Sequence, residues 1–327
     1  MKKILFASTA LVATASVAAA DVTFGGYGRF GLGYVEDRAA AAGAGFNDVS
    51  DTAIVSRFRL NIDASATTDG GVEFDARVRL QADETAANGE AGVASLNGAR
   101  FGVGYGGLRV EVGNIAGAID NLPNYYGNEP GLEGFVGQYS GVDYSFTGYT
   151  TSGTGSNGVY ARYAVGDFAV AASFESAAGG SAQATVGDRF DIHAAYSFGN
   201  ITAAIGYAST DTTVEQELTV LSLGGTWGAF SGTLLVGDED VNTGAGVLDA
   251  TISDTFYGVS ASYDVTSATT LSFAYGDGSG TGDTRNMGIG AVHDLGGGVS
   301  LRGGIGSRRT GSAASQTVAD FGAQFSF

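Results

Sequence analysis

Seven arginines fall at alternating positions in the first third of the chain, where they could form one positively charged surface. They are Arg29, Arg57, Arg59, Arg77, Arg79, Arg100 and Arg109. The chain has 16 basic residues, of which Lys2 and Lys3 are lysines, so these seven are half of its 14 arginines. Residues two apart on a β-strand share a face, and a guanidinium group stays charged at any ordinary pH. Beside an aqueous passage, such a wall would select ions and orient polar solutes. Alternatively, the arginines only satisfy a polar interior by pairing with Asp63, Glu73, Asp75 and Glu111.

A second group of chemically active residues lies in one short segment, NLPNYYGNEPGLEGF, at residues 121–135. It holds both prolines of the chain, Pro123 and Pro130. Proline lowers the entropy lost when a loop is fixed, and glycine permits sharp turns. The segment is therefore predicted to be a stiffened loop, in which the adjacent Tyr125 and Tyr126 are candidates for contact with solute.

Residues 237–249 carry the chain's only approach to a calcium-binding pattern. Asp238, Asp240 and Asn242 have the first spacings of a calcium loop, but Thr243 stands where the sharp turn needs glycine. An EF-hand is excluded, and a solvated acidic surface loop that binds calcium weakly at most is expected. No other cofactor is predicted.

The sequence offers few of the residue combinations that enzymatic catalysis requires. The chain has no cysteine, and its two histidines, His193 and His293, have no serine-and-acid or metal-ligand motif beside them. The stretch GVGYGG at residues 102–107 looks like a nucleotide-binding loop, but no helical pattern follows it. No enzyme activity is predicted.

The N-terminus and the net charge indicate an exported protein that does not bind nucleic acid. Residues 1–20 combine a basic start, an apolar run and Ala18-Ala19-Ala20, the pattern of a cleaved signal peptide. The remaining 14 arginines and 34 acids give a charge of 14 − 34 = −20, which nucleic acid phosphates would repel. Residues 21–327 show no linker and are predicted to form one domain.

A period of two dominates the chain after residue 21. In SRFRLNIDASA (residues 56–66), Phe58, Leu60 and Ile62 share one face, while the charged and polar residues share the other. Such alternation predicts strands with one apolar and one polar face. Aromatic residues gather near the strand ends, as they do at the borders of a membrane-spanning β-barrel: Phe168, Tyr196, Phe198, Tyr207, Trp227, Phe230, Tyr263 and Phe273.

Short and long connections alternate between these strands. The short ones are residues 69–71, 106–107, 166–167, 199–200, 228–229, 264–268 and 296–298. The long ones are residues 36–55, 84–98, 115–158, 176–188, 209–217, 237–254, 277–284 and 307–317. Seven short turns and eight long loops predict an all-β, 16-stranded antiparallel transmembrane β-barrel with both termini at the short-turn, periplasmic end.

Three stretches resemble the sixteen-stranded general porins of the alpha-proteobacterial, Rhodobacter type: GGYGRFGLGYVEDR (residues 25–38), SRFRLNIDA (residues 56–64) and QTVADFGAQFSF (residues 316–327). The resemblance implies a homotrimer in the bacterial outer membrane, among membrane lipids and lipopolysaccharide. Each barrel of such a trimer passes ions and small hydrophilic solutes by diffusion. It also implies that residues 115–158, the third long loop, fold into the lumen and form a constriction, where acids of the loop oppose the arginine wall. The candidate acids are Asp120, Glu129, Glu133 and Asp143.

These acids favour a cation-preferring general diffusion channel. A substrate-selective outer-membrane channel, a plugged adhesin or structural barrel, and a barrel hydrolase are the alternatives.

Overall fold

The computed structural model describes residues 21–38, 50–85, 90–176, 187–211, 215–242, 251–279 and 284–327. Its strands are β1 (Asp21–Val35), β2 (Thr52–Thr67), β3 (Glu73–Thr85), β4 (Glu90–Ala91), β5 (Ser95–Leu96), β6 (Arg100–Tyr105), β7 (Leu108–Gly113), β8 (Gly158–Val165), β9 (Phe168–Glu175), β10 (Asp188–Phe198), β11 (Ile201–Asp211), β12 (Gln216–Trp227), β13 (Phe230–Asn242), β14 (Thr251–Thr266), β15 (Thr269–Gly278), β16 (Thr284–Gly296), β17 (Val299–Thr310) and β18 (Gln316–Ser326). The predicted signal peptide, residues 1–20, lies outside the described residues, and β1 begins at Asp21.

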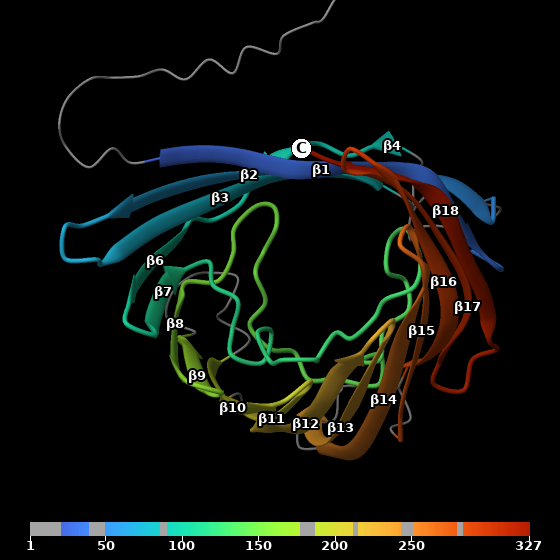
Figure 1. The fold of residues 1–327 in the computed structure, drawn as a ribbon. Coiled ribbons are helices and arrows are strands. Elements are labelled where there is room, and N and C mark those ends of the chain that lie inside the picture. The colour runs from blue at the N-terminus through green and yellow to red at the C-terminus, as the bar shows by residue number, and fades with distance from the viewer. Residues whose placement is uncertain are drawn as a thin grey trace, which may run out of the picture.

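The strands form one closed, antiparallel barrel (Figure 1). Sixteen of them are long, and the two-residue strands β4 and β5 pair only with β3. Each long strand pairs with its neighbours along the chain, and β1 closes the ring by pairing with β18 from Tyr27–Ser326 to Val35–Val318. Because closure leaves no sheet edge, every strand can satisfy its backbone within the barrel. The predicted 16-stranded barrel is confirmed.

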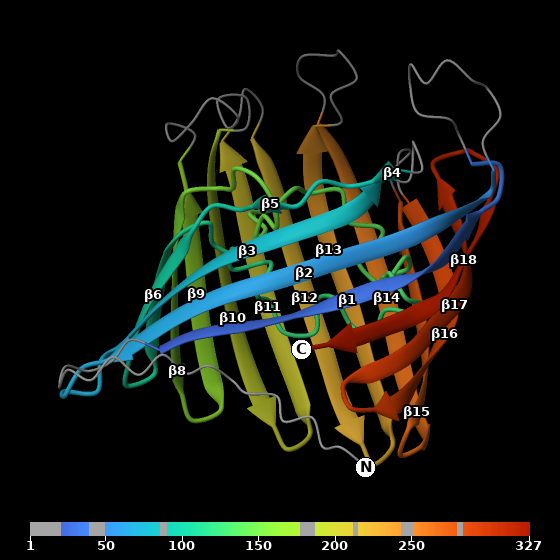
Figure 2. The same cartoon turned by 90° about the horizontal axis from the view of Figure 1, so that it is seen from above.

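The predicted short turns also join the strands as expected, and they gather at one end of the barrel (Figure 2). The C-terminus lies at the same end, because Phe327 exchanges backbone hydrogen bonds of 2.9 and 3.1 Å with Gly26 near the start of β1. No helix in the described part of the chain is long and apolar enough to cross a membrane.

The strands run further at the long-loop end than the sequence suggested. Strand β13 continues through Asn242, and its last residues pair with the start of β14, Asp238 with Thr255 and Asn242 with Thr251. The expectation of a surface loop over residues 237–249 is therefore wrong for residues 237–242, and residues 243–249 lie outside the described residues. Neither proline nor glycine interrupts residues 238–242, so the hydrogen-bond ladder continues through polar side chains.

Apolar side chains cover the outside of the barrel, as the alternation predicted. Ile54, Phe101 and Ile289 are more than half exposed. Aromatic residues lie next to the short turns, where Tyr196 stacks on Phe198 and Trp227 stacks on Phe230. This arrangement is typical of a barrel whose apolar band faces lipid and whose aromatic side chains lie at the membrane interface.

The buried core of the protein lies inside the barrel. Ile119, Leu122 and Tyr125, from the connection between β7 and β8, pack against inward side chains of β10–β14 such as Leu218 and Phe256. A barrel of this size would otherwise hold water throughout. The connection between β7 and β8 therefore converts part of an aqueous interior into packed protein.

Candidate functional site: the polar interior of the barrel

Residues 114–157, here called the inner segment, connect β7 to β8 and lie within the ring of strands (Figure 1). The outgoing half passes β9 and β10, where the Ala118 N–H donates to Ser173 Oγ (2.8 Å). It reaches its far end at Leu132 and Glu133, beside β18 and β1. The returning half then runs back along the same strands. It meets the wall of β1–β3, β6 and β7, which carries the seven arginines, where Glu133 contacts Arg29 and where the Tyr149 ring lies against Arg79.

Carboxylates of the barrel wall hold the inner segment by its backbone. Asp320 of β18 accepts the N–H groups of Leu132 (2.8 Å) and Glu133 (2.9 Å). Glu239 of β13 accepts those of Asp143 (2.7 Å) and Tyr144 (2.8 Å). Hydrogen bonds to a charged acceptor are stronger than those between neutral groups. A few wall residues can therefore fix the irregular backbone of the inner segment, which forms no β-ladder of its own.

Glycines of the wall let the inner segment approach closely. A Cβ atom on Gly258 of β14 would lie 1.8 Å from the Gln138 carbonyl oxygen, and one on Gly276 of β15 would lie 2.6 Å from the same atom. A contact below 3.0 Å forces the backbone apart. Glycine at these inward positions is therefore required by the docked segment.

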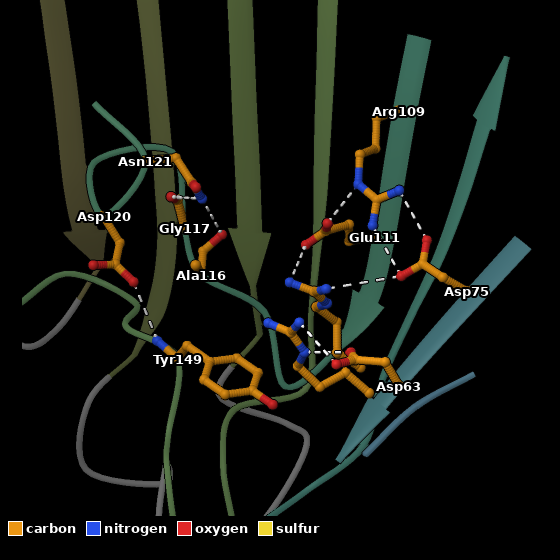
Figure 3. A network of polar contacts seen from close by, with 11 residues as sticks. Asp63, Asp75, Arg109, Glu111, Ala116, Gly117, Asp120, Asn121 and Tyr149 are labelled. Atoms are coloured by element: carbon orange, nitrogen blue, oxygen red, sulfur yellow. Dashed lines mark hydrogen bonds and ion pairs between the residues drawn. The ribbon is translucent and has the colours of Figure 1, made fainter. Parts of the chain in front are cut away.

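Three of the seven arginines form a network with acids of neighbouring strands (Figure 3). Arg109 bridges Asp75 (2.8 Å) and Glu111 (2.7 Å), and Arg100 lies 3.7 and 3.6 Å from the same two carboxylates. Arg77 makes a two-pronged pair with Asp63, at 2.5 and 3.1 Å. For these arginines the alternative interpretation holds: strand acids neutralise them.

Two further arginines keep an uncompensated charge. Arg59 donates to Gln81 Oε1 (2.6 Å) and Arg79 to Asn61 Oδ1 (2.8 Å), both neutral acceptors. Their guanidinium groups also lie over aromatic rings, Arg59 over Tyr27 at 5.1 Å and Arg79 over Tyr149 at 4.7 Å. No carboxylate in the described part of the chain forms an ion pair with either, so they supply the wall's net positive charge.

The predicted opposition of loop acids and arginines is realised at one point among the described residues. Arg29 of β1 pairs with Glu133 (2.9 Å) and also donates to the Leu132 carbonyl oxygen (3.2 Å). The remaining arginine, Arg57, pairs with Asp83 of β3. The Arg29–Glu133 contact joins the far end of the inner segment to the arginine wall.

The other three predicted acids lie elsewhere on the inner segment, beside tyrosines or beside the strands across the barrel from the arginines. Asp120 accepts the Tyr126 hydroxyl, and Glu129 accepts the Tyr139 hydroxyl (2.5 Å). Asp143 lies beside Glu239 of β13, across the barrel from the arginine strands. Glu129 reaches the lumen water, but protein surrounds it on most sides, and this desolvation raises its pKa above the usual glutamate range. Burial likewise raises the pKa of Glu133, against the opposing effect of Arg29.

The two adjacent tyrosines have different surroundings. Tyr125 is buried and stacks on Tyr139, with a centroid distance of 5.7 Å, and its edge meets Phe146 at 5.4 Å. Tyr126 is exposed, and it contacts both Tyr125 and Tyr139 edge-on at 5.1 Å. Tyr125 therefore pins the inner segment to the wall, and Tyr126 presents part of its ring to the lumen.

Several residues of this interior were missed by the sequence reasoning. The carboxylates Asp320 and Glu239 lay in the alternating pattern, but nothing in it distinguished an anchor from an ordinary lumen charge. His193 was expected on the lumen face; its ring Nδ1 donates to the Ala118 carbonyl oxygen (2.6 Å). The recurrence of glycine at inward positions of β14–β17 was a usable signal, since glycine in a strand often marks close approach of another backbone.

The predicted calcium ligands do not form a compact cage. Asp238 and Asp240 are spaced two apart along β13, so their side chains project in a row along the strand, and the backbone of Asn242 continues the same strand. Within the described residues, no group of three or more His, Cys, Asp and Glu side chains could hold a metal ion. Weak calcium binding at this strand end stays a prediction.

Known proteins share both the sequence and this architecture. The sequence profile of the Gram-negative porin family matches residues 7–313. A porin of Fuscovulum blasticum is 31% identical over 313 residues, which cover 94% of this chain and 100% of that porin. A porin of Rhodobacter capsulatus is 31% identical over 295 residues, covering 83% of this chain and 93% of that porin.

A solved structure gives the same result. A triple mutant of the Rhodopseudomonas blastica porin is 28% identical, with a TM-score of 0.74, and the alignment covers 94% of this chain and all of that one. These relatives are porins, which are channels and not enzymes. The closed sixteen-stranded barrel, its polar interior and these matches show that the chain belongs to the Gram-negative porin family and is a general diffusion porin of the outer membrane.

Proposed function

We propose that the channel is narrowed between the inner segment and the arginine wall, and that this constriction favours cations. The observation that carries the proposal is the charge of the inner segment. Its four charged side chains are all acids, Asp120, Glu129, Glu133 and Asp143, and it contains no basic residue. Four of the seven arginines of the opposite wall are paired with strand acids, and Arg29 is paired with Glu133. Asp120 and Glu129 accept tyrosine hydroxyls and form no ion pair with a described arginine, so their charge acts on the lumen. Walls of charge in a pore set its ion preference.

The same proposal covers the assembly and its setting. Residues 1–20 act as the cleaved signal peptide, both ends of the mature chain lie on the periplasmic side, and three barrels associate in the outer membrane among lipid and lipopolysaccharide. Two features support this orientation in the membrane. The apolar band faces outward, and the start of β1 lies beside Phe327 at the end of the barrel that carries the short turns. A substrate-selective channel is the second candidate function, favoured by the exposed Tyr126 ring.

Reversal potentials in planar bilayers under a salt gradient test the cation preference. Glu129→Gln removes a lumen charge that no described arginine pairs with, so the cation-to-anion permeability ratio should fall about twofold or more, with the open-channel conductance kept. Asp69→Asn, at the exposed β2–β3 turn, makes the same charge change away from the inner segment. An unchanged ratio in Glu129→Gln, or an equal change in Asp69→Asn, would show that the inner segment does not set selectivity.

A further inference from the structure

The interior of the barrel has a second polar surface, here called the neutral wall, whose lining side chains are uncharged. A cavity of about 440 Å³ lies between the inner segment and β11–β13. From the inner segment it is lined by Asn124, Tyr126 and Asn128, and from the strands by Thr202, Thr226 and Ser231. None of the described residues that line it is charged. It faces the arginine wall across the barrel, so a solute meets charge on one side and neutral amides and hydroxyls on the other.

The side chains of this cavity are held in place by the protein, and several retain hydrogen-bonding capacity. The Asn124 amide donates to the Thr202 carbonyl oxygen (3.0 Å), which fixes its orientation. The Asn128 amide donates to Ser260 Oγ (3.3 Å) and its backbone N–H to the same atom (2.7 Å). The Thr226 side chain is exposed and has no hydrogen-bond partner among the described residues.

The chemistry of this lining matches one class of solute. Amide and hydroxyl groups both donate and accept hydrogen bonds, as the hydroxyls of a saccharide do. The exposed Tyr126 ring adds an apolar surface beside its polar edge, against which the C–H face of a sugar ring can lie. The volume falls in the range of small-molecule pockets, about 300–1,000 Å³. A charged solute would leave its charge without a partner here, which is unfavourable compared with the opposite wall.

We propose that this neutral wall is a binding subsite for uncharged saccharides on their way through the channel. The proposal rests on the diffusion function given above and names a solute class for one wall of the lumen. The residues carrying it are the two asparagines and Tyr126 of the motif NYYGN, together with the hydroxyls of Thr226 and Ser231. Anionic groups would pass along the arginine wall, and neutral polyhydroxyl solutes along this one.

The test is block of the ion current through single channels by maltotriose added at the short-turn side. Polyethylene glycol of similar hydrodynamic size serves as the comparison, because it fills volume but offers no hydroxyl pattern. Maltotriose should interrupt the current in a saturable way, and the glycol should only reduce it in proportion to concentration. In Thr226→Val/Ser231→Ala, the block should weaken about twofold to tenfold, the effect of losing roughly 0.5–1.5 kcal/mol of hydrogen bonding.

The matched control is Thr67→Val, which makes the same substitution on β2, on the face that Asp63 shares. It should leave the block unchanged. Block that does not saturate, block equal to that of the glycol, or equal weakening in the control would overturn the saccharide subsite. Conductance in salt alone is recorded in the same membranes, so loss of the diffusion function is detected separately.

Discussion

The carboxylate of Asp320 offers the sharpest test of how the inner segment is held. It accepts two backbone N–H groups at the far end of the segment, at 2.8 Å from Leu132 and 2.9 Å from Glu133, and it is 8% exposed. The substitution Asp320→Asn keeps the shape of the side chain. The asparagine side chain keeps one carbonyl oxygen, which can still accept one of the two backbone N–H groups. Its NH₂ group would face the other N–H, and neither of these groups can accept a hydrogen bond.

The expected cost follows from these two bonds. A hydrogen bond to a charged group contributes about 1.5–3 kcal/mol, and a buried donor left unsatisfied costs about 1–3 kcal/mol. Weakening one bond and losing the other should therefore destabilise docking by about 2–4 kcal/mol. Since about 1.4 kcal/mol is a factor of ten, the ratio of docked to released ends should fall about 30-fold to several hundred-fold. The barrel itself should stay closed, because its strand ladder does not depend on Asp320.

Single-channel recording of Asp320→Asn in planar bilayers should show higher conductance and larger open-channel noise, as the segment's end leaves the lumen. The matched control is Asp264→Asn at the exposed end of β14, where the carboxylate accepts the Thr270 hydroxyl (2.6 Å) and does not contact the inner segment. Conductance and noise equal to those of the unmodified channel would refute the assignment of Asp320 as an anchor. The same holds if the control changes them equally.

Two further outcomes concern the lumen. Because desolvation raises the pKa of Glu129, its charge is gained only as pH rises through that higher value. Cation selectivity measured by reversal potential should therefore still increase above the ordinary glutamate range (pKa about 4.3). Glu129→Gln should reduce that increase to the part contributed by Glu133, whose pKa is also raised. Gly258→Ala would place a Cβ atom 1.8 Å from the Gln138 carbonyl oxygen, so limited proteolysis should cut the inner segment faster and conductance should rise. Gly104→Ala, whose nearest atom would be 3.8 Å away, should behave like the unmodified protein, and equal proteolysis of both variants would contradict the close-packing argument.

The barrel could be predicted because its signals are local. Alternation in residues 56–66 assigns each side chain to a face, and glycine-rich pairs such as Gly106-Gly107, with φ values of 56° and 89°, determine where a tight turn is sterically allowed. The strand ends at the long loops were misjudged, as at Asp238–Asn242, because polar residues there continue the ladder beyond the apolar band. Polarity marks the border of the membrane-facing surface, not the end of backbone pairing.

The candidate site was predictable only in part. The position of the arginines follows from alternation along consecutive strands, and the structure has all seven on β1–β3, β6 and β7. Their partners depend on cross-strand register and rotamer, which place Arg77 against Asp63 and leave Arg59 and Arg79 facing neutral amides. Of the loop acids, Glu133 meets the wall and Asp143 lies across the lumen from it, a difference set by the path of a segment that has no periodic pattern.

The sequence by itself determined the closed all-β barrel, its polar interior and the presence of an acidic segment with both prolines at residues 121–135, because period-two alternation and proline and glycine placement act over a few residues. The tertiary structure decided the course of that segment, its anchoring to Asp320 and Glu239, and the division of the lumen into a charged wall and a neutral wall. These features join residues about 100 to 190 positions apart, such as Arg29 with Glu133 and Leu132 with Asp320. Only the closure of the ring brings such residues within hydrogen-bonding distance.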